Sequence, residues 1–224
     1  MTDISPTQEW ELSYSHGVAK ALVFTEEGQG LRKPFVIVGD AQAEDGTDLA
    51  ALQAGLDHAS YSFLSDLRAR GYDAVLVGLA QGRAAALSVH GEVVTRGLMR
   101  VRQELQEPTY LVVGGLGRGA AAARFSLAKS ECEMMDHQVG CFFSYNGTAP
   151  SESTTDVGEQ NDAFELQGVG SWPKIPKKFG LVSRDFAGEP VEADAYDETR
   201  TGAATAGPAI TKELGTWLLD AVQQ

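Results

Sequence analysis

The stretch that decides the fold is YLVVGGLGRGAAAARFSL, residues 110–127. An apolar run rich in β-branched residues leads directly into a glycine-rich turn at 114–119, and four consecutive alanines follow. β-Branched runs favour strands, whereas alanine is the strongest helix former. The stretch therefore predicts a strand that turns sharply into a helix, with glycines that allow other backbone segments to approach the turn closely.

Similar strand and helix patterns alternate on both sides of this stretch. A continuous apolar run, typical of a strand buried on both faces of a sheet, occurs at 35–38. Mainly apolar segments at 72–79, 109–113, 138–145 and 179–182 predict further strands. Residues 10–25 predict one strand, or a hairpin that turns near His16 and Gly17. Helical spacing predicts helices at 47–70, 85–106 and 208–222, besides the alanine-rich helix that ends near Lys129. We expect loops at 146–168, with one short helix, and at 186–207.

The alternation of strands and helices predicts a doubly wound α/β fold with a mainly parallel sheet. Ligands of such sheets bind beyond the carboxyl ends of the strands. The segments at these ends are 39–45, 79–83, 114–119, 144–151 and 183–187. Candidate functional residues are therefore sought there.

Composition narrows the classes of partner. The chain of 224 residues has 18 Lys and Arg against 31 Asp and Glu, a net charge of −13. Such a charge opposes binding to nucleic acid and to anionic membranes. No apolar run approaches the roughly 20 residues of a membrane span, and residues 1–11 lack the features of a signal peptide.

The cysteines and acidic residues predict neither disulfides nor a metal site. Cys132 and Cys141 are the two cysteines, and their spacing matches no zinc pattern. We interpret both as thiols of a protein in the reducing cytoplasm. The acidic segments are too irregular for a calcium loop. We expect no metal and no cofactor.

The glycine turn has two interpretations. Residues 115–120 fit the dinucleotide fingerprint G-x-G-x-x-A, in which glycines let a pyrophosphate approach a helix N-terminus. That motif usually opens the first βαβ unit and needs an acidic residue about 20 positions later. Here about 110 residues precede it, and the next predicted strand ends in Ser144, Tyr145 and Asn146.

The second interpretation is a strand–elbow–helix turn. Residues 115–119 resemble the nucleophile elbow, G-x-S-x-G, of lipases and esterases of the α/β-hydrolase fold. The order of predicted elements from 35 to 185 is similar to that fold as well, and the resemblance covers about residues 10–222. It implies one α/β-hydrolase-like domain over residues 1–224, three-layered, small and without a large lid domain.

The chemistry of the family motif is broken in this chain. Gly117 stands where the family has its nucleophilic serine. The resemblance places the acid of the triad at Asp185, and in the family the histidine follows the acid. The last of the four histidines is His137, so none follows Asp185. We therefore expect no ordinary serine-hydrolase activity.

Backbone groups of the elbow remain useful without the serine. Glycine adopts the strained backbone angles of an elbow at no cost, and its small size enlarges the floor of the cleft. The N–H groups of Arg118 and Ala41 would outline an oxyanion hole for a carbonyl, an enolate or a carboxylate. Gly117, Arg118 and Ala41 are thus predicted to bind substrate.

Two acids and one histidine are candidates for proton transfer. Asp40 ends a buried strand and is predicted to be either a general acid or base, or a residue that caps its turn. Asp185 could orient a base or act alone, or it could be a loop carboxylate that pairs with Arg184. His90 lies in a predicted helix, where it could replace the missing base or be a half-buried, hydrogen-bonded histidine.

Three further residues complete the candidate site. Tyr145 and Ser144 fall at the carboxyl end of a strand, where Tyr145 could donate a hydrogen bond to a ligand and Ser144 could contact it. The side chain of Arg118 could hold an anionic group, or form an ion pair on the surface with one of the many acids.

Three functions remain open. The first is a non-hydrolytic enzyme, a cyclase or isomerase for a carbonyl-bearing small molecule; its setting in natural-product biosynthesis is implied by resemblance to repurposed family members. The second is a non-catalytic protein that binds a ligand or a partner. The third is a hydrolase with rearranged catalytic residues. The sequence leaves the oligomeric state open, a homo-oligomer included.

Overall fold

The computed structural model describes residues 4–147, 157–170, 172–187 and 195–224. Within these ranges one large sheet has the strand order β1-β2-β6-β3-β7-β8-β9-β10. Its strands are β1 (Gln8–Tyr14), β2 (Gly17–Phe24), β3 (Pro34–Val38), β6 (Asp73–Val77), β7 (Leu111–Leu116), β8 (Val139–Tyr145), β9 (Lys177–Ser183) and β10 (Glu198–Gly202).

The direction of the strands confirms the predicted sheet. Every neighbouring pair from β6 to β10 is parallel, whereas β1 with β2 and β2 with β6 are antiparallel. The first two strands form the hairpin that was one of the two predictions for 10–25, and it turns between Tyr14 and Gly17. The carboxyl ends of the parallel strands therefore share one edge of the sheet.

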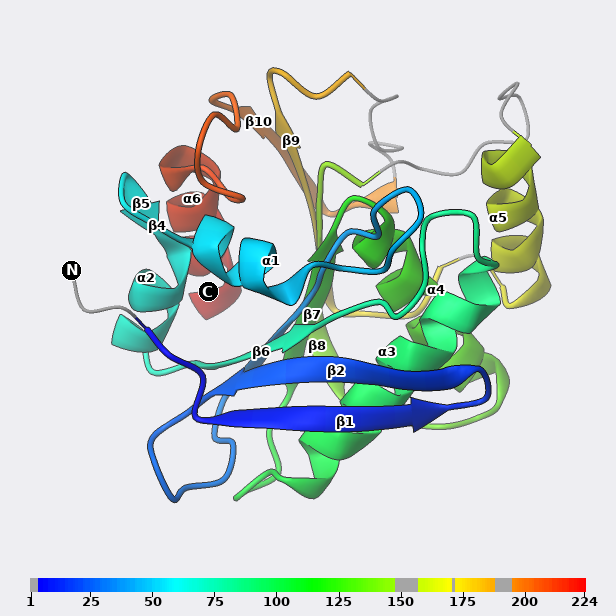
Figure 1. The fold of residues 1–224 in the computed structure, drawn as a ribbon, viewed down its shortest axis with the longest axis horizontal. Coiled ribbons are helices and arrows are strands. Elements are labelled where there is room, and N and C mark those ends of the chain that lie inside the picture. The colour runs from blue at the N-terminus through cyan, green and yellow to red at the C-terminus, as the bar shows by residue number, and fades with distance from the viewer. Residues whose placement is uncertain (1–3, 148–156, 171, 188–194) are drawn as a thin grey trace.

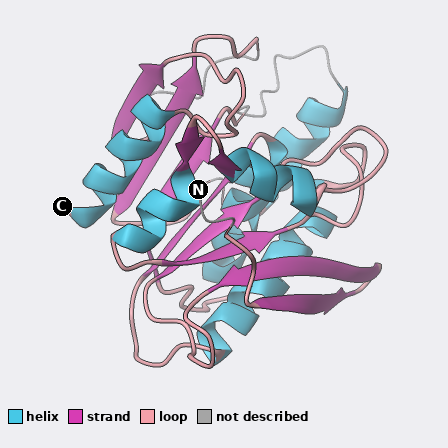
Figure 2. Cartoon of the chain, turned by 60° about the vertical axis from the view of Figure 1, so that its left-hand side comes forward, coloured by secondary structure: helices cyan, strands magenta, loops and turns pink. Residues whose placement is uncertain are grey.

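Helices cover both faces of the sheet, which gives three layers (Figure 1, Figure 2). One face carries α1 (Leu49–Leu56), α2 (Phe63–Ala69) and α6 (Lys212–Gln223), and the other carries α3 (Leu87–Gln103), α4 (Arg118–Cys132) and α5 (Val157–Gly168). Each face has its own apolar cluster. Ile37 and Val38, adjacent in β3, point into opposite clusters, as the alternation of a strand requires. The continuous apolar run at 35–38 reflects this double burial.

The prediction of one helix over 47–70 was wrong. Helix α1 ends at Leu56, and the two-residue strands β4 (Asp57–His58) and β5 (Tyr61–Ser62) precede α2. Local side-chain hydrogen bonds explain the break: the hydroxyl of Ser62 donates to the carboxylate of Asp57 and accepts from the N–H of Ser65 at 3.0 Å. Asp and Ser side chains compete in this way with a continuing helix.

The loop predicted at 186–207 was wrong in part. Strand β10 lies within it and pairs in parallel with β9 at the edge of the sheet. Four of its five residues are exposed, so it lacks the apolar pattern that marked the other strands. Helix α5 likewise has 12 residues where a short helix was expected. Residues 148–156 and 188–194 of the predicted loops lie outside the described residues.

The glycine turn between β7 and α4 has the predicted geometry. Gly117 is the N-cap of α4, with φ 52° and ψ −125°, which L side chains rarely adopt. Gly119 lies in the first turn of α4 against the end of β3, where a Cβ atom would be 2.4 Å from the carbonyl oxygen of Val38. The helix can cross the strand this closely only because the position carries no side chain.

We predict that Gly119→Ala lowers the free energy of unfolding by about 1–3 kcal/mol, the usual cost of forcing an extra carbon into a filled site. Gly168→Ala is the matched control, because nothing lies within 4 Å of its added Cβ. It should change stability by no more than about 0.5 kcal/mol. Urea unfolding of both variants measures the difference, and equal stabilities would contradict the packing described for Gly119.

Candidate functional site

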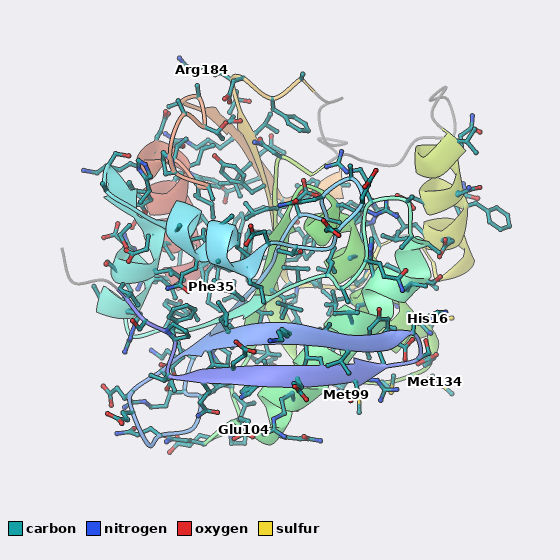
Figure 3. The ribbon with its side chains drawn as sticks, in the orientation of Figure 1. His16, Phe35, Met99, Glu104, Met134 and Arg184 are labelled. Carbon is teal, nitrogen blue, oxygen red and sulfur yellow. The ribbon has the colours of Figure 1, made fainter. Side chains whose placement is uncertain are left out.

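A cleft of about 500 Å³ opens at the carboxyl ends of the parallel strands, directly above the glycine turn. We call it the elbow cleft; its walls include Asp40, Arg83, Gly117, Arg118, Asn146, Asp162 and Phe186. Figure 3 labels Arg184, just past β9, at this end of the sheet, and Glu104, at the end of α3, at the opposite one. A second cavity of about 370 Å³ shares Asp40, Ala43 and Arg83 with the cleft and continues past Ala41, Leu52 and Leu116.

The carboxylate of Asp40 occupies the space next to the side-chain position of Gly117. A Cβ atom on Gly117 would be 2.5 Å from Cγ of Asp40 and 2.6–2.7 Å from its two oxygens. Oδ1 of Asp40 accepts the backbone N–H of Arg118 at 2.8 Å. Asp40 therefore caps helix α4 from another segment of the chain, where the negative charge also interacts favourably with the helix dipole.

This contact occupies one of the two N–H groups of the predicted oxyanion hole. The Arg118 N–H is directed at Asp40, so a ligand reaches it only after displacing that carboxylate. Ala41 lies in the wall of the second cavity and is 2% exposed. Its N–H has no hydrogen-bond partner within the described ranges. The two N–H groups thus differ in availability, which the sequence could not indicate.

Arg83 forms the other contact of Asp40. Its Nη2 lies 2.9 Å from Oδ2, and the two side chains are 62% and 41% exposed. Backbone hydrogen bonds hold the loops after β3 and β6 together: the N–H of Arg83 donates to Gln42 at 2.8 Å, and that of Thr47 donates to Leu79 at 2.7 Å. A pair this exposed contributes about 0–1 kcal/mol, so Arg83 can be drawn away at low cost.

In the wall of the cleft, the guanidinium of Arg118 is fixed by several hydrogen bonds. Its Nη1 and Nη2 atoms make a bidentate pair with Asp162 of α5, and Nη2 also donates to the carbonyl of Ala85 at 2.7 Å. The two charged side chains are only 12% and 7% exposed. Of the two roles predicted for Arg118, the structure therefore shows the ion pair, although the pair is buried rather than on the surface.

His90 completes this buried network. Its Nδ1 accepts from Nε of Arg118 at 3.0 Å, so the ring proton must be on Nε2, which donates to the carbonyl of Gln81 at 3.0 Å. Burial and the neighbouring Arg118 charge lower the pKa of His90 from 6.5 to about 4. The imidazole is therefore neutral at pH 7, and both of its nitrogens already have partners.

Three other predicted residues do not line the elbow cleft. Tyr145 is buried on the face of the sheet that carries α6, where its hydroxyl accepts the N–H of Thr211 at 3.3 Å. Ser144 is 2% exposed and not part of the wall. Asp185 is exposed but accepts from the N–H and hydroxyl of Thr205 rather than pairing with Arg184. These hydrogen bonds lower the pKa of Asp185 to about 2.

Two groups were missed by the sequence analysis. Arg83 ends segment 79–83, which follows a predicted strand, so its place at a strand end is a signal that the sequence contains. Asp162 lies in an acidic stretch with no distinguishing pattern, and only the fold brings it to Arg118. Glu165, one turn later on α5, accepts the N–H of Ser88 near the start of α3 at 2.7 Å.

The structure accounts for the glycines without a dinucleotide. Gly115 lies close to the start of helix α4, since an added Cβ would be 2.4 Å from the backbone of Gly119. Gly119 faces β3, and Gly117 faces Asp40. A pyrophosphate at this helix N-terminus would meet the carboxylate of Asp40, whose charge repels it.

Other kinds of site have no support in the part of the chain that the structure describes. It contains no group of three or more His, Cys, Asp or Glu side chains that could hold a metal ion. None of its helices is long and apolar enough to cross a membrane.

Comparison with known proteins finds solved structures of similar fold, but no protein of similar sequence. No family model matches the chain, and no curated protein matches its sequence. Similar solved structures include a lipase/esterase from Lactobacillus plantarum, with a TM-score of 0.63, 9% identity and 96% of each chain covered. A hyperthermophilic esterase from Pyrobaculum calidifontis has a TM-score of 0.66 and 11% identity, covering 96% of this chain and 83% of its own.

A fungal esterase structure from Rhizomucor miehei is similar over 96% of this chain and 81% of its own, with a TM-score of 0.61 and 11% identity. Identities this low establish the fold alone. The eight-stranded, mainly parallel sheet and the helices on both of its faces agree with that likeness. The chain has an α/β-hydrolase-like fold, as the elbow resemblance implied.

We predict that restoring a serine at the elbow is incompatible with Asp40. Gly117→Ser should destabilise the protein, since its Cβ would overlap the carboxylate of Asp40. Asp40→Gly removes the overlap, so the double variant should lose about 0.5–3 kcal/mol less than the sum of the single variants, a coupling expected of residues in contact. Chemical denaturation of the four proteins measures this coupling, and additive costs would contradict the contact.

A second prediction concerns pH. Because the pKa of folded His90 lies below its ordinary value of 6.5, unfolding takes up a proton between about pH 4 and pH 6.5. The stability from neutral His90 is fully present above pH 6.5 and is lost as the pH falls toward 4, by at most about 1.4 kcal/mol per pH unit. His90→Gln should remove this part of the slope. A stability difference between wild type and variant that is constant from pH 7 to pH 4 would refute it.

Proposed function

We propose that the chain is a non-hydrolytic enzyme of the cyclase or isomerase type, acting on a carbonyl-bearing small molecule in the elbow cleft. The observation that carries the proposal is the position of Asp40. Its carboxylate stands beside the elbow glycine, where an elbow side chain would begin, and 41% of it remains exposed to the cleft. The carboxylate of Asp40 would therefore lie next to a carbonyl group bound in the cleft.

Asp40 suits proton transfer better than the other candidates. His90 has both nitrogens engaged, Tyr145 is buried elsewhere, and Asp185 does not line the cleft. Each carboxylate oxygen of Asp40 accepts one hydrogen bond, from Arg118 or Arg83, and has a further lone pair available. The carboxylate can therefore accept a proton while it stays in place.

The chemistry would proceed without a covalent intermediate. Asp40 removes a proton from the carbon next to the substrate carbonyl, and the exposed guanidinium of Arg83 stabilises the negative charge that develops on the oxygen. Asp40 then returns the proton to another atom of the substrate. In this scheme Arg83 takes the electrostatic role that the sequence assigned to the N–H of Arg118.

The size and lining of the two cavities support a small-molecule substrate. The elbow cleft presents charged groups, whereas the second cavity adds the apolar side chains of Leu52 and Leu116. We extend the proposal to one catalytic domain over residues 1–224, in the cytoplasm, with a role in natural-product biosynthesis. Cys132 and Cys141 are both free thiols, which fits a reducing compartment.

A non-catalytic binding protein is the alternative that a specific observation favours. The N–H of Arg118, both nitrogens of His90 and most donors of the Arg118 guanidinium are already engaged. A site with so few free groups could bind a ligand without transforming it. The two functions differ in whether Asp40 moves a proton.

The test follows hydrogen–deuterium exchange at the carbons next to the carbonyl of simple ketones, cyclohexanone and phenylacetone among them, by NMR in D₂O. We expect the wild type to accelerate exchange and Asp40→Asn to lower that acceleration by about 10²–10⁴-fold, the usual worth of general acid–base catalysis. Ligand-observed NMR should show that the variant still binds the same ketones.

The matched control is Asp136→Asn, which neutralises an exposed carboxylate in the turn before β8. It should exchange protons at the wild-type rate. Binding of the ketones without accelerated exchange would favour the non-catalytic protein. Hydrolysis of an activated ester such as p-nitrophenyl acetate that persists in Asp40→Asn would instead favour a hydrolase with rearranged residues.

A further inference from the structure

A separate cavity of about 440 Å³ lies at the amino ends of β3, β7, β8 and β9, the opposite edge of the sheet from the elbow cleft. We call it the basal groove. The groups that matter are Lys33, Tyr72, Val112, Cys141 and Lys177, all in its wall. Nothing in the proposed function uses this cavity.

The floor of the basal groove is apolar and is set by strand register. Val112 pairs with Cys141, and Cys141 pairs with Lys177, so the three side chains form a row on one face of the sheet. Val112 and Cys141 are only 6% and 5% exposed. Phe35, labelled in Figure 3, continues this row through its pairing with Val112, and the ring of Tyr72 meets it edge-on at 5.9 Å.

The rim of the basal groove carries two lysines that lack acidic partners. The lysines at positions 20, 129 and 178 make ion pairs with Glu or Asp, whereas Lys174 and Lys212 make none among the described residues and lie outside the groove wall. In the described part of the chain, neither Lys33 nor Lys177 takes part in an ion pair. In a protein of net charge −13, two unpaired ammonium groups beside one cavity are a local positive site.

The other polar groups of the groove do not cancel this charge. Burial raises the pKa of the Cys141 thiol to about 12, so it is uncharged at neutral pH. Burial also raises the pKa of Tyr72, whose hydroxyl stays protonated. The nearby Asp197 is engaged by Lys178, at 3.6 Å. The lysines are therefore available to an anion from solution.

We propose that the basal groove binds a small anionic amphiphile, whose short apolar body covers Val112 and Cys141 and whose acidic head pairs with Lys33 or Lys177, at either end of that floor. The combination of cationic rim, apolar floor and uncharged hydroxyl fits a medium-chain carboxylate. A volume near 440 Å³ falls within the range of small-ligand pockets. The site is distinct from the elbow cleft, so each can exist without the other.

Octanoate is the probe, with 1-octanol as its uncharged counterpart. Isothermal titration should show one octanoate bound per chain and at least tenfold weaker binding of octanol. Lys33→Gln/Lys177→Gln should weaken octanoate binding at least tenfold, whereas Lys33→Arg/Lys177→Arg should retain it. Lys212→Gln is the control, since that lysine begins α6, at the end of the helix remote from Val222 of the groove.

Backbone amide NMR signals report the location of the bound probe. Octanoate should shift the signals of Val112, Cys141 and Lys177 in the basal groove and leave those of Gly117 and Arg118 in the elbow cleft unchanged. The proposal is overturned if octanoate does not bind at millimolar concentration, if the double glutamine variant binds as well as wild type, or if the groove signals do not shift. An Asp40→Asn variant should bind octanoate normally.

Discussion

The carboxylate of Asp40, set against a glycine at the start of helix α4, is the contact on which the candidate site depends. It holds the first free N–H of that helix at 2.8 Å and one guanidinium nitrogen of Arg83 at 2.9 Å. One side chain thus joins the loop after β3, the loop after β6 and the turn after β7. The space it needs exists only because Gly117 carries no Cβ. The glycine at the elbow and the carboxylate in the cleft therefore depend on each other.

A second set of contacts supports this arrangement. Helix α5 directs two carboxylates at the amino ends of its neighbours: Asp162 pairs with Arg118 of α4, and Glu165 accepts the N–H of Ser88 on α3. Breaking a buried pair such as Arg118 with Asp162 leaves an uncompensated charge and is far more costly than breaking an exposed one. The exposed pair of Asp40 and Arg83 is the part of the network free to respond to a ligand.

Periodicity and glycine placement were sufficient to predict most of the fold. The mainly apolar segments found the buried strands, because burial on both faces leaves few polar residues within them. They missed β10, an exposed edge strand held by backbone pairing, and the break at Asp57 and Ser62, which depends on side-chain hydrogen bonds.

The candidate site was harder to predict from the sequence than the fold. Position at a strand end suggested Asp40 and Gly117, but it also suggested Tyr145, whose side chain points to the other face of the sheet. The partners Asp162 and Arg118 are 44 residues apart, and no local pattern joins them.

The carboxylate that fills the space above Gly117 also limits which single substitutions the chain can tolerate at this position. A lone substitution that brought back a serine would enter occupied volume, and one that removed Asp40 alone would leave a helix end uncapped. Either path to a nucleophilic elbow therefore passes through a less stable intermediate, and neither supplies a histidine. Positions 40 and 117 are therefore coupled, because a change at either one alone lowers stability.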